Sequence, residues 1–538
     1  MTNTRSFTLA ELAACATEST DGAGLSAADG QALVTALAHD SRQVGAGTLF
    51  FCVTGTQSDG HAYGADAVAA GAVALVVERL LPELKVPQVL VTDSRGALAR
   101  VAELFYDYPS QKMRVTGITG TNGKTTTAFI LESLLKSAGR TTGLIGTVAT
   151  HLADIREPAG RTTPDALELQ RLLARMREAG VTDVVMEVSS HALDLERVRG
   201  VRFACTAFTN LSQDHLDWHH DMEQYFGAKK KLFCDYEVAA RVINTDDAWG
   251  RRLFAELQDG GCAPFAVGAW PPAGQQETSA PVGGKHGEPD LSFDPAQVDF
   301  QPDATDFTLR ERGGGPRGDE SRGDAAGCRV HVPLVGAYNV HNVLIAVGCA
   351  LHLGLNLEQI AAALPHIAAV PGRLQHVDEG QDFTVLVDYA HTDDALRTAL
   401  TALRQVTPGR LITVFGCGGD RDRAKRPLMG RAAGECSDYV IATSDNPRSE
   451  DPDAILREIN AGLKECSAPF ELITDRATAI AAALGLAQAG DCVFIAGKGH
   501  ETYQIFADRT IHFDDREVAA QALRRLQDPA RGSTEEVL

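Results

Sequence analysis

Residues 114–126, Arg-Val-Thr-Gly-Ile-Thr-Gly120-Thr-Asn-Gly-Lys124-Thr-Thr126, hold the pattern that decides the fold. We predict a strand at 114–119, a glycine-bearing turn up to Lys124, and a helix from Thr125 to Ala138 that Gly139 ends. A strand, a glycine-rich loop and a helix in this order can cradle phosphate groups. In such a loop Lys124 would reach the β- and γ-phosphates, and the Thr125 hydroxyl could hold Mg²⁺.

The loop departs from the common G-x-x-x-x-G-K-[ST] spacing, because Ile118 occupies the position of the first glycine. A glycine-rich turn with an incidental lysine is the structural alternative. The position of the loop between a predicted strand and a predicted helix favours the phosphate loop.

Short apolar runs alternate with helical stretches along the rest of the chain. They lie at 48–53, 74–77 and 88–91 before the loop, and at 143–148, 183–188, 383–387, 411–415 and 491–496 after it. Strands alternating with helices predict parallel sheets covered on both faces. The predicted class is therefore α/β.

A chain of 538 residues is too long for one core, so we expect three domains. They are a small N-terminal α/β domain at 1–110, a central P-loop-type parallel-sheet ATPase domain at 111–369, and a C-terminal doubly wound, Rossmann-like domain at 370–538. Residues 270–324 are rich in Gly, Pro, Asp and Gln, which indicates an elaborated β-hairpin or a loose insertion.

Composition excludes some classes of function. There are 71 acidic residues against 50 Lys and Arg, an excess that argues against a nucleic-acid-binding surface. The longest apolar run, 67–77, is shorter than the ~20 residues that a membrane helix needs. Eleven cysteines without a C-x-x-C pair favour reduced thiols, and the N-terminus has no long apolar segment. We expect a cytoplasmic enzyme with no membrane insertion.

Three residues beyond the loop carry candidate chemistry. Glu187 ends a predicted strand, where a carboxylate could bind the Mg²⁺ of a nucleotide. His215 and Lys229 follow in polar segments. Taken singly, each has a structural alternative: a capping or solvated glutamate, a hydrogen-bonded histidine, and a solvated helix face at 229–231.

Four segments together resemble the Mur ligase family, which is itself similar to folylpolyglutamate synthetase and cyanophycin synthetase. They are GTNGKTT at 120–126, MEVSSHAL at 186–193, NLSQDHLD at 210–217, and the Ala-Lys pair at 228–229 before Leu232-Phe233. The resemblance covers nearly the whole chain, and the loop of that family reads Gly-Thr-x-Gly-Lys-Thr/Ser. It implies domains that bind a UDP-sugar, ATP and an amino acid, and a monomeric amide ligase that works through an acyl phosphate.

The resemblance also implies two Mg²⁺ ions. Thr125 and Glu187 match ligands of the first ion; Glu187, His215 and a carbamylated Lys229 match ligands of the second. Carbamylation is physically sensible because CO₂ converts a repelling ammonium into an oxygen-donating anion. The catalytic residues would be Lys124, Glu187, His215 and Lys229.

Substrate-binding residues follow from the same resemblance. The residues that would bind ATP are Gly120, Thr121, Asn122, Gly123, Lys124, Thr125, Thr126, Asn339, Asn342, Arg373, Asp388 and His391. Those that would bind a UDP-N-acetylmuramoyl-dipeptide are Ser41, Thr56, Gln57, Ser58, Thr162, Thr163, Ser189, Arg197 and Lys229. The structural alternatives are an ordinary turn and strand around 40–58, and a helix cap for Asn339.

The segment 443–448, Thr-Ser-Asp-Asn-Pro-Arg, resembles the members of the family that add meso-diaminopimelate. This amino acid has a distal carboxylate that lysine lacks, and a guanidinium such as Arg448 can bind it bidentately. The predicted set is Arg421, Asp445, Asn446, Pro447, Arg448, Gly497 and Glu501, with Glu501 holding the distal ammonium. Taken alone, 445–448 is a turn and 497–501 a loop.

Three alternatives remain open at this point. A lysine-adding Mur ligase and a folylpolyglutamate-type ligase would keep the phosphate loop but should lack Arg448. A nucleotide-dependent switch could bind ATP without forming amide bonds. His215 and Lys229 argue against a switch, which needs no second metal ion.

Overall fold

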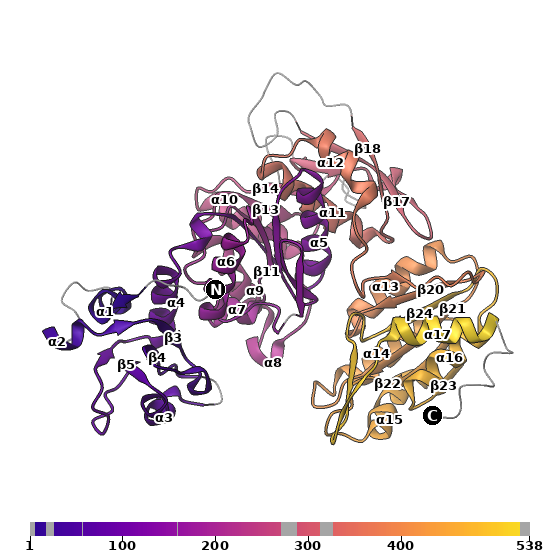
Figure 1. Ribbon diagram of the computed structural model, residues 1–538. Helices are drawn as coiled ribbons and strands as arrows, with labels where there is room; N and C mark the ends of the chain where they lie inside the picture. The colour runs from indigo at the N-terminus through magenta and orange to yellow at the C-terminus, as the bar shows by residue number, and fades with distance from the viewer. Residues whose placement is uncertain are drawn as a thin grey trace. The chain divides into compact units, whose positions relative to one another are not determined.

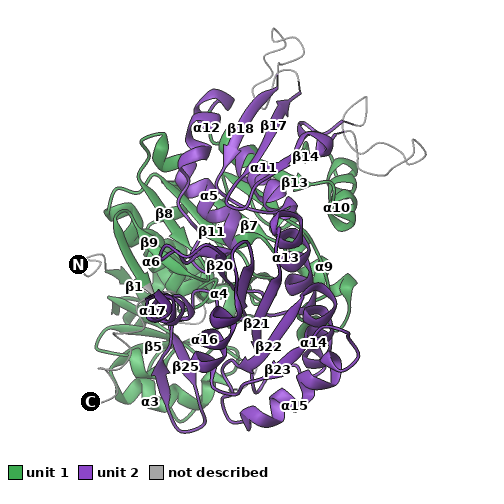
Figure 2. Ribbon diagram, turned by 90° about the vertical axis from the view of Figure 1, so that its right-hand side faces the viewer, with its two compact units in different colours: residues 1–124, 135–266, 348–355 green, residues 125–134, 267–347, 356–538 purple. Residues whose placement is uncertain are grey.

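The computed structural model describes residues 6–17, 26–55, 58–158, 160–270, 288–312 and 327–527. The chain divides into two compact units (Figure 2). The first comprises residues 1–124, 135–266 and 348–355, and the second comprises residues 125–134, 267–347 and 356–538. Within the described ranges, no helix has the length and apolar character needed to cross a membrane.

The first unit begins with a four-stranded parallel sheet. Its order is β3 (Ala36–Ala38), β4 (Thr48–Phe51), β5 (Ala72–Val77) and β6 (Gln88–Leu90). Leu49 and Phe51 pack with helices α1 (Leu9–Thr17) and α4 (Ser94–Phe105), whereas Phe50 packs on the other face with Ala67 of α3 (Gly64–Ala69). Because successive side chains point to opposite faces, burial on both faces explains the continuous apolar runs.

The phosphate loop follows a central strand, β7, of the larger sheet. Within the first unit the strands of this sheet run in the order β10-β9-β8-β11-β7-β12-β13. The parallel members are β7 (Arg114–Thr119), β8 (Thr142–Ile145), β11 (Asp183–Glu187), β12 (Cys205–Phe208) and β13 (Arg241–Asn244). β9 (Ala149–Leu152) and β10 (Ile155–Pro158) form an antiparallel hairpin. The helices of this part of the first unit are α6 (Ala166–Glu178), α7 (Ser190–Asp194), α8 (Leu216–His219), α9 (Met222–Cys234) and α10 (Ala248–Asp259). Helix α5 (Lys124–Ser137) begins and ends in the first unit, but its residues 125–134 belong to the second.

The second unit contains an antiparallel group of strands. β17 (Thr305–Glu311) pairs with β15 (Leu291–Phe293), β16 (Asp299–Phe300) and β18 (Cys328–Val332). Within the segment predicted as a hairpin or loose insertion, residues 288–312 thus form paired strands, while 271–287 and 313–324 lie outside the described residues. β14 (Phe265–Ala269), α11 (Ala337–His352) and α12 (Leu357–Ala363) are the neighbouring elements along the chain.

A six-stranded sheet completes the second unit, and most of its strands are labelled in Figure 1. Its order is β19 (Gln375–His376), β20 (Thr384–Asp388), β24 (Cys492–Ala496), β21 (Leu411–Cys417), β22 (Tyr439–Ser444) and β23 (Phe470–Leu472), parallel except for β19. Helices α13 (Asp393–Val406), α14 (Lys425–Cys436) and α15 (Pro452–Leu463) pack on one face. Helices α16 (Arg476–Leu486) and α17 (Asp515–Gln527) pack on the other. The predicted α/β class with parallel sheets is confirmed; the predicted domain boundaries stay a prediction.

Candidate active site

The phosphate loop joins β7 to α5, as predicted. Gly120 has a φ of +149°, and a Cβ there would lie 1.9 Å from Thr209 Oγ1, so this position requires glycine. The N–H groups of Thr121 and Asn122 donate to the backbone and side-chain oxygens of Asn210, both at 2.9 Å. Lys124 Nζ donates to the carbonyls of Gly120 (2.9 Å) and Thr121 (2.8 Å). The segment after β12 therefore supports the loop that the segment after β7 forms.

Lys229 of α9 lies against this loop. Its side chain is only 1% exposed, and its Nζ donates to Gly120 O at 2.8 Å and lies 4.5 Å from the Tyr225 ring centre. Burial, and then the charge of Lys124, lower the pKa of Lys229 well below its usual value. A solvated helix face is therefore the wrong interpretation for Lys229, although Lys230 and Lys231 do form surface ion pairs.

His215 lies close to the same group of residues. Its ring centre is 4.8 Å from that of His191 and 6.2 Å from that of Tyr225. Partial burial lowers the pKa of His215, and nearby groups such as His191, Lys124 and Lys229 act in the same direction. Asp214, whose carboxylate lies 3.4 Å from His215 Nε2, acts against this lowering. A neutral imidazole has a lone pair available for a ligand.

Tyr225 is a residue that sequence reasoning missed. It is buried, and its hydroxyl lies 3.2 Å from Thr121 Oγ1. Tyr225 and Lys229 are four residues apart on α9, so they share a helix face. This four-residue spacing was the sequence signal that could have identified Tyr225. The structure thus brings Lys124, His215 and Lys229 together around Gly120 and Tyr225.

Glu187, at the carboxyl end of β11, is held by Thr147, a second residue that the predictions lacked. Glu187 Oε1 accepts from Thr147 N at 2.9 Å and Oε2 accepts from Thr147 Oγ1 at 3.1 Å. Thr147 Oγ1 also lies 3.0 Å from Thr162 Oγ1. The predicted metal ligand and the predicted dipeptide-binding segment therefore belong to one hydrogen-bond network.

The same network includes other residues predicted to bind the dipeptide. Thr163 Oγ1 donates to Glu187 O at 2.9 Å and accepts from Ser189 N at 3.2 Å. Arg197 Nη1 donates to Thr163 O at 3.1 Å. Ser189 Oγ caps α7 by accepting from Ala192 N. This segment is rigidly supported by backbone and side-chain contacts.

The predicted uridine segment is described in part. Ser41 begins a short 3₁₀ turn that Asp40 caps, and Ser58 O accepts from Gly55 N at 2.9 Å. Thr56 and Gln57 lie outside the described residues. His39 Nε2, next to this segment, lies 3.4 Å from Asp165 Oδ1. This contact ties residues 39–41 to the segment that follows Thr162 and Thr163.

The pair between His39 and Asp165 predicts a pH dependence of stability. The hydrogen bond that His39 donates to the Asp165 carboxylate raises the pKa of His39 above its unfolded value of about 6.5. The extra proton affinity stabilises the fold below that pH, and this stabilisation is lost as the pH rises through the raised pKa. His39→Gln should flatten the fall in melting temperature with rising pH, measured by calorimetry. The exposed His366→Gln is the control, and equal slopes for wild type and His39→Gln would contradict the prediction.

In the second unit, the side chains of Asn339 and Asn342 of α11 are buried and hydrogen-bonded to each other. Asn342 Nδ2 donates to Asn339 Oδ1 at 2.9 Å, and Asn339 Nδ2 donates back to Val335 O at 2.8 Å. Asn339 is therefore not an N-cap whose side chain accepts from the helix, the alternative interpretation.

Arg373, Asp388 and His391 follow in the same unit. Arg373 Nη2 lies 3.5 Å from Thr125 Oγ1, and its guanidinium lies 4.9 Å from the Tyr389 ring centre. Asp388 is buried, and its carboxylate accepts from the N–H groups of Leu374 (2.7 Å) and Ala390 (2.8 Å). The exposed His391 contacts Tyr389 O through Nδ1. We interpret Asp388 as the residue that fixes the backbone beside Arg373.

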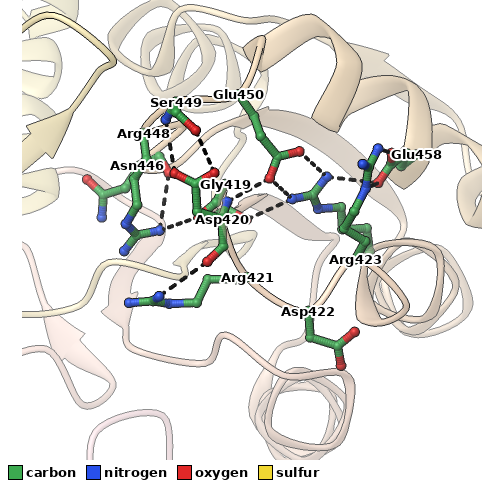
Figure 3. Close-up of polar contacts among 12 residues, drawn as sticks. Gly419, Asp420, Arg421, Asp422, Arg423, Asn446, Arg448, Ser449, Glu450 and Glu458 are labelled. Carbon is green, nitrogen blue, oxygen red and sulfur yellow. Dashed lines mark hydrogen bonds and ion pairs between the residues drawn. The ribbon is translucent and has the colours of Figure 1, made fainter. Parts of the chain in front are cut away.

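The predicted amino-acid-binding residues lie on three loops that follow the neighbouring strands β22, β21 and β24. Asn446 Nδ2 donates to Glu501 Oε2 at 2.8 Å, which links the first loop to the third. Arg448 Nη1 donates to Gly419 O at 2.7 Å, which links the first to the second (Figure 3). Ligands of doubly wound sheets bind at this carboxyl edge.

Among these residues, Glu501 has a raised pKa. Burial and the nearby Asp445 raise the pKa of Glu501, whereas Lys498 and Asn446 act against this rise. Lys498 is fully buried, and its Nζ lies 3.4 Å from Glu501 Oε2. The predicted set lacked Lys498, although the Gly-Lys-Gly-His-Glu motif at 497–501 contained it.

Three segments of the chain match parts of one family. Residues 33–106 match the "Mur ligase family, catalytic domain", residues 118–288 the "Mur ligase middle domain", and residues 372–499 the "Mur ligase, glutamate ligase domain". The chain belongs to the Mur ligase family. This Mur ligase is therefore an ATP-dependent, ADP-forming amide ligase, and membership argues against the nucleotide-dependent switch.

Several relatives share one name. The chain is 44% identical to a UDP-N-acetylmuramoyl-L-alanyl-D-glutamate–2,6-diaminopimelate ligase from Solibacter usitatus, over 92% of this chain and 94% of the relative. It is 47% identical to the ligase of that name from Gloeobacter violaceus, over 91% and 94%. A solved structure with the same name superposes with a TM-score of 0.67 at 30% identity, covering 97% of this chain and all of the other. The MurF ligase of Thermotoga maritima in complex with ADP shares the fold, with a TM-score of 0.59 at 19% identity over 92% of this chain and 98% of the other.

Proposed function

We propose that this Mur ligase adds meso-diaminopimelate to UDP-N-acetylmuramoyl-L-alanyl-D-glutamate, a step of peptidoglycan precursor synthesis. One observation carries the choice of amino acid: Arg448 and Glu501 lie on loops that Asn446 joins, at the carboxyl edge of one sheet. A guanidinium and a carboxylate match the distal carboxylate and ammonium of diaminopimelate. The names of the relatives agree with this choice. We further propose a cytoplasmic monomer that acts on small molecules.

The reaction proceeds in two chemical steps, formation of an acyl phosphate and then of the amide. The terminal carboxylate of the nucleotide-linked dipeptide attacks the γ-phosphorus of ATP, and ADP leaves. The amino group of diaminopimelate then attacks the acyl phosphate, forming the amide and releasing phosphate and a proton. Lys124 would neutralise charge on the γ-phosphate during the first step. Thr162, Thr163 and Arg197 would hold the dipeptide close to Glu187.

The donor atoms fit Mg²⁺ in part. Among the described residues, no three His, Cys, Asp or Glu side chains form a metal cage. Mg²⁺ does not require such a cage, since it commonly takes one or two carboxylates together with waters and phosphate oxygens. Glu187 and the Thr125 hydroxyl would supply oxygens, with His215 and a carbamate on Lys229 at a second ion. Bound Mg²⁺ would supply charge neutralisation and orientation of the phosphates.

Carbamylation of Lys229 is supported by its surroundings. An uncharged amine attacks CO₂, which forms an N–C bond and releases one proton to give the carbamate. Lys229 is fully buried and shares the Gly120 carbonyl with Lys124 Nζ. Two ammonium groups on one carbonyl repel each other, so the neutral amine is favoured.

Arg448→Ala tests the amino-acid assignment. We expect kcat/KM for diaminopimelate to fall by roughly thirtyfold to several hundredfold, because a charge-assisted bidentate contact is worth about 2–4 kcal/mol. The KM for ATP should change little. Lysine should gain little, since removing the guanidinium builds no site for an uncharged end. Amide formation with each amino acid measures these constants.

Arg457→Ala is the matched control, since that exposed arginine of α15 pairs only with Asp451 among the described residues. Wild-type enzyme that prefers lysine would refute the assignment. A change of less than about twofold in Arg448→Ala would refute the role of this arginine.

A further inference from the structure

Two residues on the amino-acid loops adopt an unusual backbone conformation. Arg448 and Asp420 both have a φ of +52°. Side chains other than glycine are uncommon in this left-handed region, and such residues persist where their surroundings hold them. Both residues therefore need anchoring contacts.

Ser449 anchors one loop on the other. Its N–H donates to Asp420 Oδ2 at 3.1 Å and its hydroxyl donates to Asp420 Oδ1 at 2.7 Å. On the Arg448 side, the backbone N–H of Arg448 donates to Ile505 O at 3.0 Å. The peptide units on both sides of the left-handed Arg448 Cα are thus fixed, and Figure 3 shows the Ser449 side of this arrangement.

Asp420 is in turn fixed by Glu450. The Asp420 N–H donates to Glu450 Oε1 at 2.6 Å. The Arg426 side chain is fully buried, and its Nη2 and Nη1 donate to the two oxygens of Glu450 at 2.8 and 3.0 Å. Arg426 holds the pKa of Glu450 at about 2, so this carboxylate stays ionised at neutral pH. The buried Arg426 of α14 therefore holds Glu450, and Glu450 in turn holds Asp420.

The guanidinium end of Arg448 is also placed. Among the described residues it makes hydrogen bonds only through Nη1, to Gly419 O at 2.7 Å and Asn446 O at 3.5 Å. Its Nε and Nη2 edge is the pair of donors that a carboxylate binds bidentately. A Cβ at Gly418 would lie 2.9 Å from Arg448 Nη1. Glycine at 418 thus provides the space in which this guanidinium lies.

We propose that Glu450, through Asp420 and Ser449, and the missing side chain at Gly418 position the Arg448 guanidinium to receive the distal carboxylate of the incoming amino acid. This inference rests on the proposed function. In this arrangement the substrate does not contact Glu450, Asp420, Ser449 or Gly418. They are positioning residues, and they determine specificity through Arg448.

Gly418→Ala is the first test. The atom that the new Cβ meets is the end of a flexible side chain, so the guanidinium should shift while the fold is kept. Because small misplacements can cost up to about a hundredfold, we expect KM for diaminopimelate to rise about tenfold or more. The KM for ATP should stay within about twofold. Gly485→Ala, on α16 with open space around its Cβ position, is the matched control and should leave both constants unchanged.

Glu450→Ala and Glu458→Ala form a second, paired test. Each removes one carboxylate from the buried Arg426, since Glu458 Oε2 accepts from Arg426 Nη1 at 2.8 Å. Only Glu450 also accepts from the Asp420 N–H. Both variants should lower the melting temperature, but only Glu450→Ala should raise KM for diaminopimelate.

The outcomes separate the two proposals. A wild-type preference for lysine overturns the proposed function. A wild-type preference for diaminopimelate with an unchanged KM in Gly418→Ala overturns the positioning role alone. Equal effects of Glu450→Ala and Glu458→Ala on that KM also overturn it, because both would then act only through stability. A selective rise in both test variants supports the proposal.

Discussion

Replacing Lys124 by alanine should lower the turnover number by at least about a thousandfold. Phosphoryl transfer depends mainly on neutralising charge on the transferred group, and Lys124 is the cation of the phosphate loop. In the structure its Nζ binds the Gly120 and Thr121 carbonyls, at 2.9 and 2.8 Å. ATP would replace these neutral acceptors with charged phosphate oxygens, which form stronger hydrogen bonds. Release of ADP at saturating substrates measures the effect.

Lys136→Ala is the matched control for Lys124→Ala. Both lysines belong to α5, but Lys136 is exposed in its last turn. This control should keep wild-type turnover and a similar melting temperature. Turnover close to wild type in Lys124→Ala would remove the phosphate-loop assignment, whichever amino acid the enzyme adds.

The strands and helices could be predicted well, because the patterns that indicate them lie in short, continuous stretches of sequence. The strand predicted at 114–119 is β7 with the same bounds, and the helix predicted at 125–138 is α5 at Lys124–Ser137. Gly139, with a φ of +75°, follows that helix. Both faces of these parallel sheets are buried, so several strands, such as β5, β21 and β24, are mainly apolar runs bounded by turn residues.

Contacts between distant segments were not predictable from such patterns. Arg426 lies in a stretch of charged residues that is typical of a solvated surface, yet its side chain is fully buried against Glu450 and Glu458. Thr147 holds Glu187 across 40 residues of sequence. No spacing rule connects such pairs, because the packing of α14 on α15 and the order of the strands β8 and β11 in the sheet bring them together.

Lys229 shows the same limit within one helix. Three consecutive lysines indicate a polar face, but 100° of rotation per residue separates their directions. Lys229 points into the core beside Gly120, whereas Lys231 pairs with Asp194 at the surface. The family resemblance selected Lys229, and its burial supports that choice.

Lys229→Ala should lower turnover by about a thousandfold, because a carbamate there would supply anionic oxygens to Mg²⁺ in a site that acts mainly through charge. Substitution empties a buried space beside Gly120 and Tyr225. A short carboxylic acid such as acetate or propionate can enter that space and present the same kind of oxygens. We therefore expect partial recovery of turnover, saturable in the added acid, which a purely structural lysine would not show.

Lys231→Ala is the control for this prediction, since it removes an exposed lysine two positions away on the same helix. It should keep wild-type turnover and show no response to carboxylic acids. Wild-type enzyme incubated with ¹³CO₂ should give a carbamate carbon signal in NMR that is absent from Lys229→Ala and kept in Lys231→Ala. Because the neutral amine is the form that reacts with CO₂, burial next to Lys124 should favour the modification at this lysine over its exposed neighbours. Active wild-type enzyme without that signal, or a Lys229→Ala variant that no carboxylic acid rescues, would contradict the carbamate and leave Lys229 as a buried donor to the Gly120 carbonyl.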